Sequence, residues 1–275
     1  MSIASTTKKP LLTVYDMAGG VVAFSTTRHG GYSTGSYGEF NINRYCGDDS
    51  EAIARNREAL CQLLGIDDRR LLMPHQVHRA EVACIDAAFL NLTPVERNEK
   101  LEGVDAVMTC IPGVCIGVST ADCIPILLFD KQRRVACAVH AGWRGTVQRI
   151  AKRAVAAMTA CYGSELADIV AQIGPGISLE SFEVGQEVYD AFMAEGFCME
   201  SISSLMPSSQ GAGEEKWHID LPACNRLQLQ EAGLLGEQIH TLPVCTYEHH
   251  TDYFSARRLG IRSGRIFTGI MLKEE

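Results

Sequence analysis

The sequence lacks any apolar run long enough to cross a membrane, and it has no excess of basic residues. Nowhere do about 18 apolar residues follow one another, and residues 1–20 contain no apolar stretch of signal-peptide length. With 33 acidic against 25 basic residues the formal net charge is −8, so composition predicts no surface for a nucleic acid backbone. We therefore expect a protein that binds neither a membrane nor nucleic acid.

The chain also lacks the motifs of two familiar kinds of metalloenzyme. A multicopper oxidase needs paired H-x-H motifs and about ten histidine ligands, whereas this chain has 8 histidines and no H-x-H. Cytidine-type zinc deaminases combine H-x-E with P-C-x-x-C, and neither motif occurs. The sequence therefore excludes three-domain laccase chemistry and the cytidine deaminase mechanism.

The 11 cysteines show no paired spacing of the kind that marks a disulfide framework. Their number is odd, and most lie inside apolar runs such as CIGVST and VACAVH. Thiols in such runs are typical of reduced, buried cysteines in a reducing compartment. We therefore expect free thiols and a cytoplasmic location.

Apolar patterns of two periods alternate along the chain. Runs rich in Val, Ile and Cys predict strands, several of them buried on both faces, at residues 21–26, 105–110, 115–120, 124–130, 135–140, 168–174, 239–247 and 265–273. Helical periods predict a helix after residue 50 with Ile53, Leu60 and Leu64 on one stripe, a second helix over 144–161, and a third from Pro222 to near Gly233.

The organisation of the chain is that of one large unit. Residues 203–216 have loop composition and predict a long surface loop, while no repeat and no linker divides the sequence. A length of 275 residues lies at the upper end for one domain. We expect a single domain over residues 1–275, built from mixed sheets with helices against them, in the α/β or α+β class.

Two chemically able side chains stand at the ends of neighbouring strands. Cys123 follows the polar turn of 119–122, and His140 ends the run VACAVH just before Gly142, where backbone can approach a ligand closely. Because the turn-like KQRR joins the two apolar runs, they predict a β-hairpin that brings Cys123 near His140.

A third ligand candidate lies in PHQVHRAEV, where His75 and His78 precede an apolar strand. Three N or S ligands with an open fourth position are the arrangement of catalytic zinc. The same geometry without a metal is a Cys/His nucleophilic pair, with Cys123 as thiolate and His140 as base. Spacing alone does not separate these two interpretations from an ordinary core cysteine beside a hydrogen-bonded histidine.

A series of motifs follows in order along nearly the whole chain: TTRHGGYSTGSYGEFNIN (26–43), GDDSEAIARNR (47–57), QVHRAEV (76–82), DAVMTC (105–110), STADCIPILL (119–128), AVHAGWRGT (138–146), IGPGISLESFEVGQEV (173–188), ID (219–220), CTY (245–247) and FSARRLGIRSGR (254–265). Together they resemble the YfiH family, also called the multicopper polyphenol oxidase or laccase-domain family. The resemblance implies an α+β fold of mixed sheets flanked by helices, similar to the catalytic domains of bacterial cytotoxic necrotising factors.

The resemblance also implies a site and an activity. The zinc ligands of the family correspond to His78, Cys123 and His140, and its reported reactions are phosphorolysis of purine nucleosides, including methylthioadenosine, and deamination of adenosine. The chain departs from the family pattern at Arg79, where glycine is usual, and the nearby His75 is the less favoured alternative to His78 as a ligand. Zn²⁺ is the expected cofactor, with Cu²⁺ as the alternative that would support phenol oxidation as a side activity.

Two residues before the central motifs are candidates for substrate binding. Arg57 falls on the apolar stripe of the first helix, and a buried arginine requires an anionic partner. That partner is either a carboxylate, such as Asp105 or Asp122, or the substrate itself. Asn41, in the alternating segment FNIN, is a candidate to hydrogen-bond a ribose or a base.

Two later arginines are candidates to hold phosphate. Arg144 follows HAGW at the start of a helix, beside backbone amides suited to anions. Arg258, with its neighbour Arg257, would form a second cationic edge. Arg144 also fits an ordinary helix cap, and Arg257 and Arg258 also fit an ordinary salt-bridged turn. Asp122 and Glu81 are the candidates for a general acid or base in deamination.

Three classes of function remain open for this sequence. The first is a zinc-dependent purine nucleoside phosphorylase that uses free purine nucleosides and phosphate, with adenosine deaminase activity. The second is a Cys-dependent hydrolase, for example on cell-wall intermediates, with Cys123 as nucleophile. The third is a structural metal site or binding module without turnover.

Overall fold

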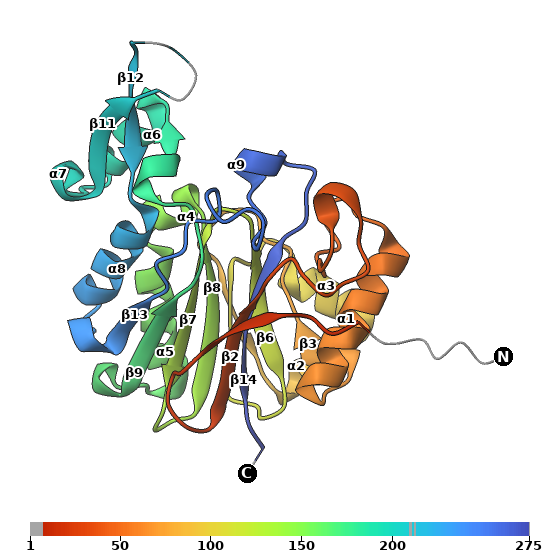
Figure 1. Cartoon of the computed structure of the whole chain (residues 1–275). Coiled ribbons are helices and arrows are strands. Elements are labelled where there is room, and N and C mark those ends of the chain that lie inside the picture. Colours follow the sequence, from red (N-terminus) through yellow and green to blue (C-terminus); the bar gives the residue numbers. More distant parts are fainter. Residues whose placement is uncertain (1–7, 209–210, 212, 275) are drawn as a thin grey trace.

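A computed structural model describes residues 8–208, 211 and 213–274, and two β-sheets packed face to face form its main body. In the first sheet the central strand β14 pairs antiparallel with β2 and β6. The strands of this sheet, in spatial order, are β1 (Leu12–Tyr15), β2 (Val21–Thr26), β14 (Ile266–Leu272), β6 (Cys115–Thr120) and β3 (Leu71–Leu72). The last strand of the chain, β14, thus lies in the middle of this sheet, between β2 and β6 (Figure 1).

The second sheet has the predicted β-hairpin at its centre. Its strands, in spatial order, are β13 (Ile239–Thr241), β9 (Ile169–Ile173), β7 (Ile124–Asp130), β8 (Val135–Ala141), β5 (Ala106–Thr109) and β4 (Val82–Ile85). β7 and β8 pair antiparallel with Pro125 opposite His140. Parallel pairs join β4 to β5 and β13 to β9 at its two edges. The predicted hairpin and the mixed character of the sheet are therefore confirmed.

Burial of β7 on both faces follows from its place between two layers. Leu127 and Phe129 pack into the space between the two sheets, and the alternate residues Ile126 and Leu128 pack against helices on the other side. A strand covered on both faces has no solvent face to supply polar residues, which explains its continuous apolar run. Each such side chain contributes about 1.5–3 kcal/mol when fully buried.

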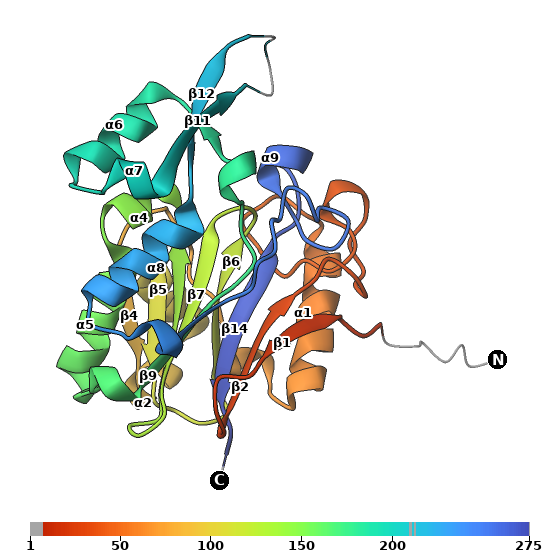
Figure 2. The same ribbon diagram turned by 60° about the vertical axis from the view of Figure 1, so that its left-hand side comes forward.

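Helices cover the outer faces of both sheets, so the main body has four layers (Figure 2). α1 (Ser50–Leu64) packs Leu60 against Phe24 and Phe267 of the first sheet. α5 (Ile150–Tyr162) and α8 (Leu221–Glu231) pack against the second sheet. The α+β class, with mixed sheets flanked by helices, is therefore confirmed.

The second predicted helix is divided in the structure. α4 (Trp143–Val147) ends before Arg149, whose φ of 63° lies in the left-handed region, and α5 begins at the next residue. The guanidinium of Arg149 donates to the carbonyl of Glu195 and lies over the ring of Phe197. These contacts with a distant segment accompany the break, and apolar periodicity within 144–161 carries no sign of them.

The prediction of a long surface loop over 203–216 was wrong. β11 (Ser203–Pro207) and β12 (Glu215–Ile219) pair antiparallel, and β10 (Glu183–Val184) joins β12 to complete a third sheet. Much of this hairpin is exposed, so polar residues are tolerated in strands and its composition resembles a loop. Residues 209, 210 and 212, within the predicted loop, lie outside the described residues.

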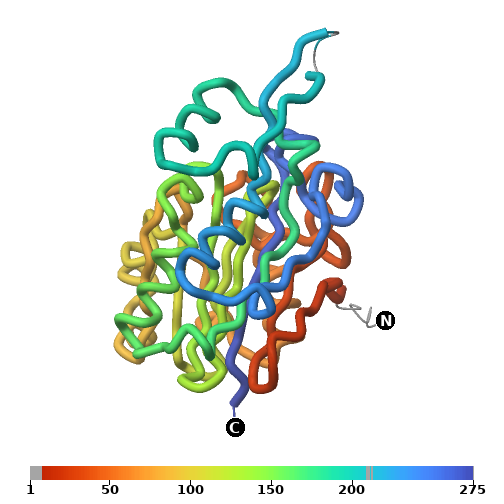
Figure 3. Tube along the Cα trace, turned by 90° about the vertical axis from the view of Figure 1, so that its left-hand side faces the viewer, coloured from red at the N-terminus to blue at the C-terminus, as the bar shows by residue number. Residues whose placement is uncertain are grey.

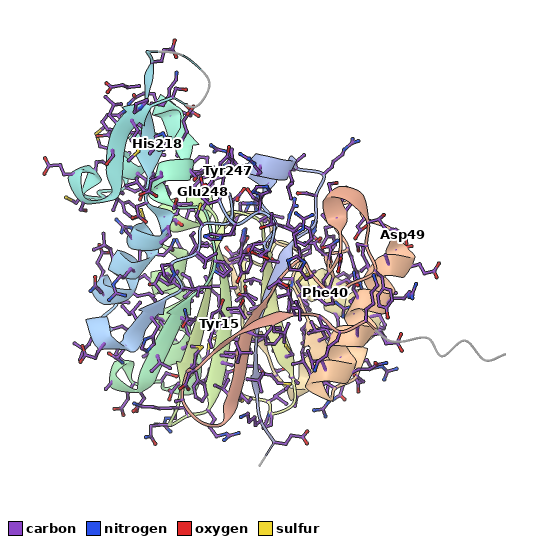
Figure 4. The ribbon with its side chains drawn as sticks, in the orientation of Figure 1. Tyr15, Phe40, Asp49, His218, Tyr247 and Glu248 are labelled. Atoms are coloured by element: carbon purple, nitrogen blue, oxygen red, sulfur yellow. The ribbon has the colours of Figure 1, made fainter. Side chains whose placement is uncertain are left out.

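The third sheet forms a lobe with α6 (Gln186–Ala194) and α7 (Met199–Ile202), and this lobe extends beyond the two large sheets (Figure 3). His218 of β12 lies in the lobe, above Tyr247 and Glu248 of the segment that follows β13 (Figure 4). The strand predicted over 239–247 is shorter in the structure, where β13 ends at Thr241. Pro243 has no N–H with which to continue the β-ladder.

Shorter helices complete the fold. They are α2 (Ala87–Leu90), α3 (Pro94–Leu101) and α9 (Ala256–Leu259), with 3-10 turns at Gly35–Tyr37, Asp68–Arg70, Leu166–Asp168, Leu179–Ser181 and Gly236–Gln238. Among the described residues, no helix is both long and apolar enough to span a lipid bilayer.

Candidate metal centre

Three ligand-type side chains meet at one edge of the sheets. His78 lies in the loop between β3 and β4, Cys123 in the turn between β6 and β7, and His140 near the end of β8. Their ligand atoms all lie within 4.8 Å of one another. The ends of these strands lie near α4 and α9 (Figure 1). The structure therefore brings together the three residues that the sequence singled out.

Backbone conformation at two positions shapes this cluster. His78 has a φ of 62° and Asp122, next to Cys123, has a φ of 87°, both in the left-handed region that non-glycine residues rarely adopt. The carboxylate of Asp122 accepts hydrogen bonds from Thr246 Oγ1 at 2.8 Å and from the backbone N–H of Arg257 at 2.7 Å. Asp122 therefore holds the turn that presents Cys123, and both of its oxygens are occupied in that role.

Asp105 organises the other side of the cluster. Its buried carboxylate accepts from the backbone N–H groups of Val77, His78 and Arg79, at 3.3, 3.0 and 2.7 Å. It also pairs with Nδ1 of His140 at 2.7 Å. One carboxylate thus fixes the His78 loop and the orientation of the His140 ring, which leaves Nε2 of His140 as the free ligand atom.

The expected role of Asp105 as a partner of Arg57 was wrong, and its role at the cluster was missed. A carboxylate directly before an apolar strand was the only signal in the sequence. Burial works against the charge of Asp105, but His140 and the backbone N–H groups hold the pKa of its carboxyl below the usual range.

Charge in the cluster favours a thiolate beside an imidazolium. Burial by itself would raise the pKa of Cys123, but the charge and hydrogen bonds of His140 and His78 lower it to about 6. Burial lowers the pKa of His140, whereas Cys123 and Asp105 together raise it to about 9. The two groups are tightly coupled, and each stabilises the charged form of the other.

Gly142 provides the close backbone approach that the sequence predicts. A Cβ at this position would lie 2.8 Å from Cδ2 of His78 and 3.1 Å from Sγ of Cys123. Its φ of −70° suits any residue, so the need for glycine is purely steric. Arg79 also fits, because the left-handed conformation falls on His78 and not on the position where the family has glycine.

The cluster opens into a cavity of about 400 Å³, which we call the metal cavity. Its wall contains both polar and apolar side chains. They are Asn43, Tyr45, Cys46, Pro74, His75, Gln76, His78, Ser119, Thr120, Ala121, Cys123, His140, Ala256, Ile261, Arg262 and Arg265. Gln76 bonds the backbone of Ser119 through both ends of its amide, at 2.7 and 2.8 Å. This contact fastens the His78 loop to the end of β6.

His75 lies in the wall of the metal cavity but not in the cluster. Its Nδ1 contacts the carboxylate of Glu102 at 2.8 Å, and its ring stacks on Tyr45 with centroids 4.0 Å apart. The group of ligand atoms comprises His78, Cys123 and His140 without it. The geometry therefore places His78, rather than His75, with the other two residues.

Two proposed substrate-binding residues lie outside the wall of the metal cavity. Arg57 is buried as expected, yet its guanidinium pairs with Asp68 at 2.6 Å and donates to the carbonyl of Leu71. The expected partners Asp105 and Asp122 were wrong, because helix α1 lies on the far side of the first sheet.

Asn41 is fully buried and bonds both its own loop and the loop that carries Arg265. Its amide donates to the carboxylate of Asp48 at 2.8 Å and accepts from the backbone N–H of Asn43 and of Arg265. Neither Asn41 nor Arg57 is part of the wall of the metal cavity. Asn41 nevertheless bonds the backbone of Asn43 and Arg265, which are both part of the wall.

The arginines chosen from sequence also lie outside the wall. Arg144 is exposed over the ring of Trp143, and Arg258 is exposed against Tyr247, to which it donates a hydrogen bond. Arg257 donates to the carbonyl of Glu183. Glu81 is also exposed and outside the wall, so the structure does not bring it to the cluster.

Arg262 and Arg265 occupy the wall in their place, and sequence reasoning missed both. Arg265 donates to the carbonyls of Ile261, Ser263 and Gly264, so its loop consumes its donors. Arg262 is exposed, and its guanidinium has no hydrogen bond or ion pair within the described part of the chain. The Gly and Ser residues of LGIRSGR indicated a loop, but not which arginine would face the cavity.

Comparison with known proteins finds relatives along nearly the whole chain. The chain is 45% identical over 249 residues to a purine nucleoside phosphorylase of Bacteroides thetaiotaomicron, covering 90% of each protein. It is 44% identical over 254 residues to the adenosine deaminase RL5 of an unknown prokaryotic organism, covering 92% of this chain and 95% of the relative.

Solved structures with the same fold also cover nearly the whole chain. YfiH of Bacillus licheniformis superposes with a TM-score of 0.86 at 25% identity over 98% of both chains. YlmD of Geobacillus stearothermophilus superposes with a TM-score of 0.82 at 29% identity over 93% of both. Residues 22–273 match the multi-copper polyphenol oxidoreductase laccase family. The motifs, the fold and these matches agree, and the chain therefore belongs to this laccase-like YfiH family.

Proposed function

We propose that this protein is a zinc-dependent purine nucleoside phosphorylase acting on adenosine, inosine and methylthioadenosine, with adenosine deamination as a further reaction at the same site. The observation that carries the proposal is the cluster of His78, Cys123 and His140 in the wall of a cavity of about 400 Å³. That volume lies in the range of small-molecule sites. Relatives named purine nucleoside phosphorylase and adenosine deaminase support the same reading.

The donor set fits zinc. Two imidazoles and one thiolate leave a fourth position open, as in catalytic zinc sites. Asp105 holds His140 so that Nε2 is available, and the lowered pKa of Cys123 supplies the thiolate at neutral pH. A zinc ion held there would supply a Lewis acid beside the reacting bond.

The rest of the metal cavity offers groups for both reactants. The guanidinium of Arg262 has no hydrogen bond or ion pair with any described residue, so its N–H groups are available to phosphate oxygens. Tyr45 and Ile261 present aromatic and aliphatic surface to a purine ring, and both are exposed at the cavity. Asn43 and Ser119, already bonded to each other at 2.7 Å, form a polar wall suited to ribose hydroxyls.

His75 is our candidate for proton transfer to the departing purine. Among the described residues the wall of the metal cavity contains no carboxylate side chain, so the task falls to an imidazole outside the metal ligands. Glu102 bonds Nδ1 of His75 and thereby orients the ring. We expect His75→Gln to lower kcat about 100-fold with unchanged zinc content, and unchanged kcat would remove His75 from this role.

The experiment that tests the function supplies adenosine, inosine or methylthioadenosine with and without phosphate. Release of free base only when phosphate is present, together with ribose 1-phosphate (5-methylthioribose 1-phosphate from methylthioadenosine), supports phosphorolysis. Cys123→Ser is the matched negative variant and Cys84→Ser is the control, because Cys84 is exposed and outside the metal cavity. If no purine nucleoside yields base with the zinc-loaded protein, the proposal is refuted.

A Cys-dependent hydrolase is the second candidate, and the low pKa of Cys123 beside His140 favours it. The two candidates differ in their need for metal. A hydrolase would keep its activity after chelation and lose it on thiol alkylation, whereas a zinc phosphorylase would lose its activity on chelation alone.

The same His and Cys ligands also accept copper. Phenol oxidation is therefore a side activity to measure in parallel, with copper-loaded protein. We expect zinc to predominate in protein purified without added metal, which metal analysis checks.

A further inference from the structure

A second cavity, of about 150 Å³, lies between the Asp68–Arg70 turn and α3, and the charged side chains in its wall are mostly basic. Four arginines and a single acid line it, and Tyr45 separates it from the metal cavity. We call it the arginine cavity, and its charged residues are Arg44, Arg57, Arg69, Arg97 and Asp68. None of the contacts that form the metal centre involves these five residues.

One carboxylate lies among the four arginines of this cavity. Asp68 pairs with Nη2 of Arg57 at 2.6 Å and lies 3.5 Å from Nη2 of Arg44. The side chain of Arg57 is only 7% exposed, so its charge is buried and held in place. Asp68 therefore compensates Arg57 and part of Arg44, and no further carboxylate lines this cavity within the described residues.

The other two arginines have no acidic partner here. Arg97 donates to the backbone carbonyls of Leu92, Leu90 and Arg69, which fixes its guanidinium without neutralising it. Arg69 is exposed, and its side chain forms no hydrogen bond or ion pair with any residue that the structure describes. The wall thus combines rigid positive charge with unused donors.

This positive charge is local, since the whole chain carries a net charge of −8. Glu58 and Asp67 lie nearby, but they line a neighbouring cavity that shares Arg44, Arg57 and Asp68 with this one. Four arginines around one small cavity repel one another, because like charges at close range repel. An anion in the cavity would relieve that repulsion.

We propose that the arginine cavity binds a small multivalent oxyanion, of which inorganic phosphate is the representative. Guanidinium groups match tetrahedral oxyanions with two parallel N–H donors. The volume of about 150 Å³ suits such an ion, and it is less than half that of the metal cavity, so a whole nucleoside does not fit. This site does not rest on the proposed catalytic function.

The test is calorimetric titration of the full-length, zinc-loaded protein with phosphate, and separately with sulfate, at ionic strength held constant with NaCl. The variant is the Arg44→Gln/Arg69→Gln double substitution. The control is Arg133→Gln/Arg153→Gln, which removes the same charge from two exposed positions outside every cavity described above.

We expect saturable binding of one phosphate in this cavity, weakened at least about tenfold in the double variant and unchanged in the control. Any oxyanion that binds in the metal cavity remains in the double variant, so failure of the phosphorylase proposal is distinguishable from failure of this one. Equal affinity in the variant and the wild type, or a response that chloride reproduces, overturns the site.

Two further arms complete the test. A crystal soaked in tungstate should show anomalous density between Arg57 and Arg97, and its absence at saturating tungstate contradicts the proposal even if the double variant fails to fold. AMP distinguishes the source of the oxyanion. Competition between AMP and phosphate that depends on Arg44 and Arg69 supports a phosphoryl group of a nucleotide as ligand, and binding of phosphate alone supports the free ion.

Discussion

Two thiols of the same hairpin have opposite chemistry. Cys137 lies in the middle of β8, and burial without a charged neighbour raises its pKa to about 12. Cys123 lies at the start of the hairpin, where His78 and His140 overcome the effect of burial and lower its pKa to about 6. Burial alone thus silences a thiol, whereas burial beside imidazoles activates it.

The largest expected difference is between a variant that lacks the Cys123 thiol and one that lacks the Cys137 thiol. We expect Cys123→Ser to lose bound zinc and to lower kcat/KM for purine nucleosides at least about 100-fold, since a hydroxyl is a poor zinc ligand. Cys137→Ser should retain zinc and activity but lower the free energy of unfolding by about 1–3 kcal/mol, because it buries a hydroxyl. Metal analysis and urea unfolding measure the two effects. Equal zinc content in both variants would contradict the distinction.

Asp105→Asn tests whether zinc binding at Cys123 depends on the hydrogen bond between Asp105 and His140. The substitution removes a charge that orients His140 and accepts three backbone N–H bonds. We expect zinc affinity or activity to fall about 10–100-fold. Asp68→Asn, which removes a carboxylate outside the metal cavity, is the control, and competition with a zinc-binding dye gives the affinity. An unchanged affinity in Asp105→Asn would show that the His140 orientation is fixed by packing alone.

Gly142→Ala tests the steric side of the same comparison. The new Cβ would press on His78 and Cys123, so we expect zinc affinity to fall about tenfold, toward the lower end for a perturbed metal site. Gly19→Ala is the matched control, because a Cβ there meets nothing within 4 Å. Both variants should unfold at similar urea concentrations in the absence of metal. Full zinc affinity in Gly142→Ala would mean that the loop of His78 yields to the added methyl group.

The smallest expected effect is a pH dependence in metal-free protein. Because the pKa of Cys123 is lowered to about 6, its thiolate persists above that pH and is lost as pH falls through it. The alkylation rate of Cys123 should therefore be about half-maximal at pH 6 and change only about twofold from pH 6 to 8. Burial raises the pKa of Cys84, so its alkylation rate should increase only in alkaline solution. Peptide mass spectrometry separates the two rates, and parallel pH profiles would remove the claimed activation of Cys123.

Sequence reasoning succeeded where contacts are local or follow from a repeated pattern. The runs around Cys123 and His140 are joined by a short polar turn, so antiparallel pairing left little choice of register. The stripe of α1 correctly placed Arg57 in the interior. It could not identify Asp68 as the partner, because that contact depends on how the chain turns after the helix.

The sequence by itself determined the central strands of the two large sheets, the main helices and the two ligand candidates of the hairpin, because periodicity and turn composition act over a few residues. Only the tertiary structure decided that Asp105 supports His140, that Arg262 rather than Arg144 or Arg258 faces the cavity, and that the segment after residue 203 forms a third sheet. Each of these depends on segments distant in sequence packing side by side, and packing is set by the whole core rather than by any local pattern.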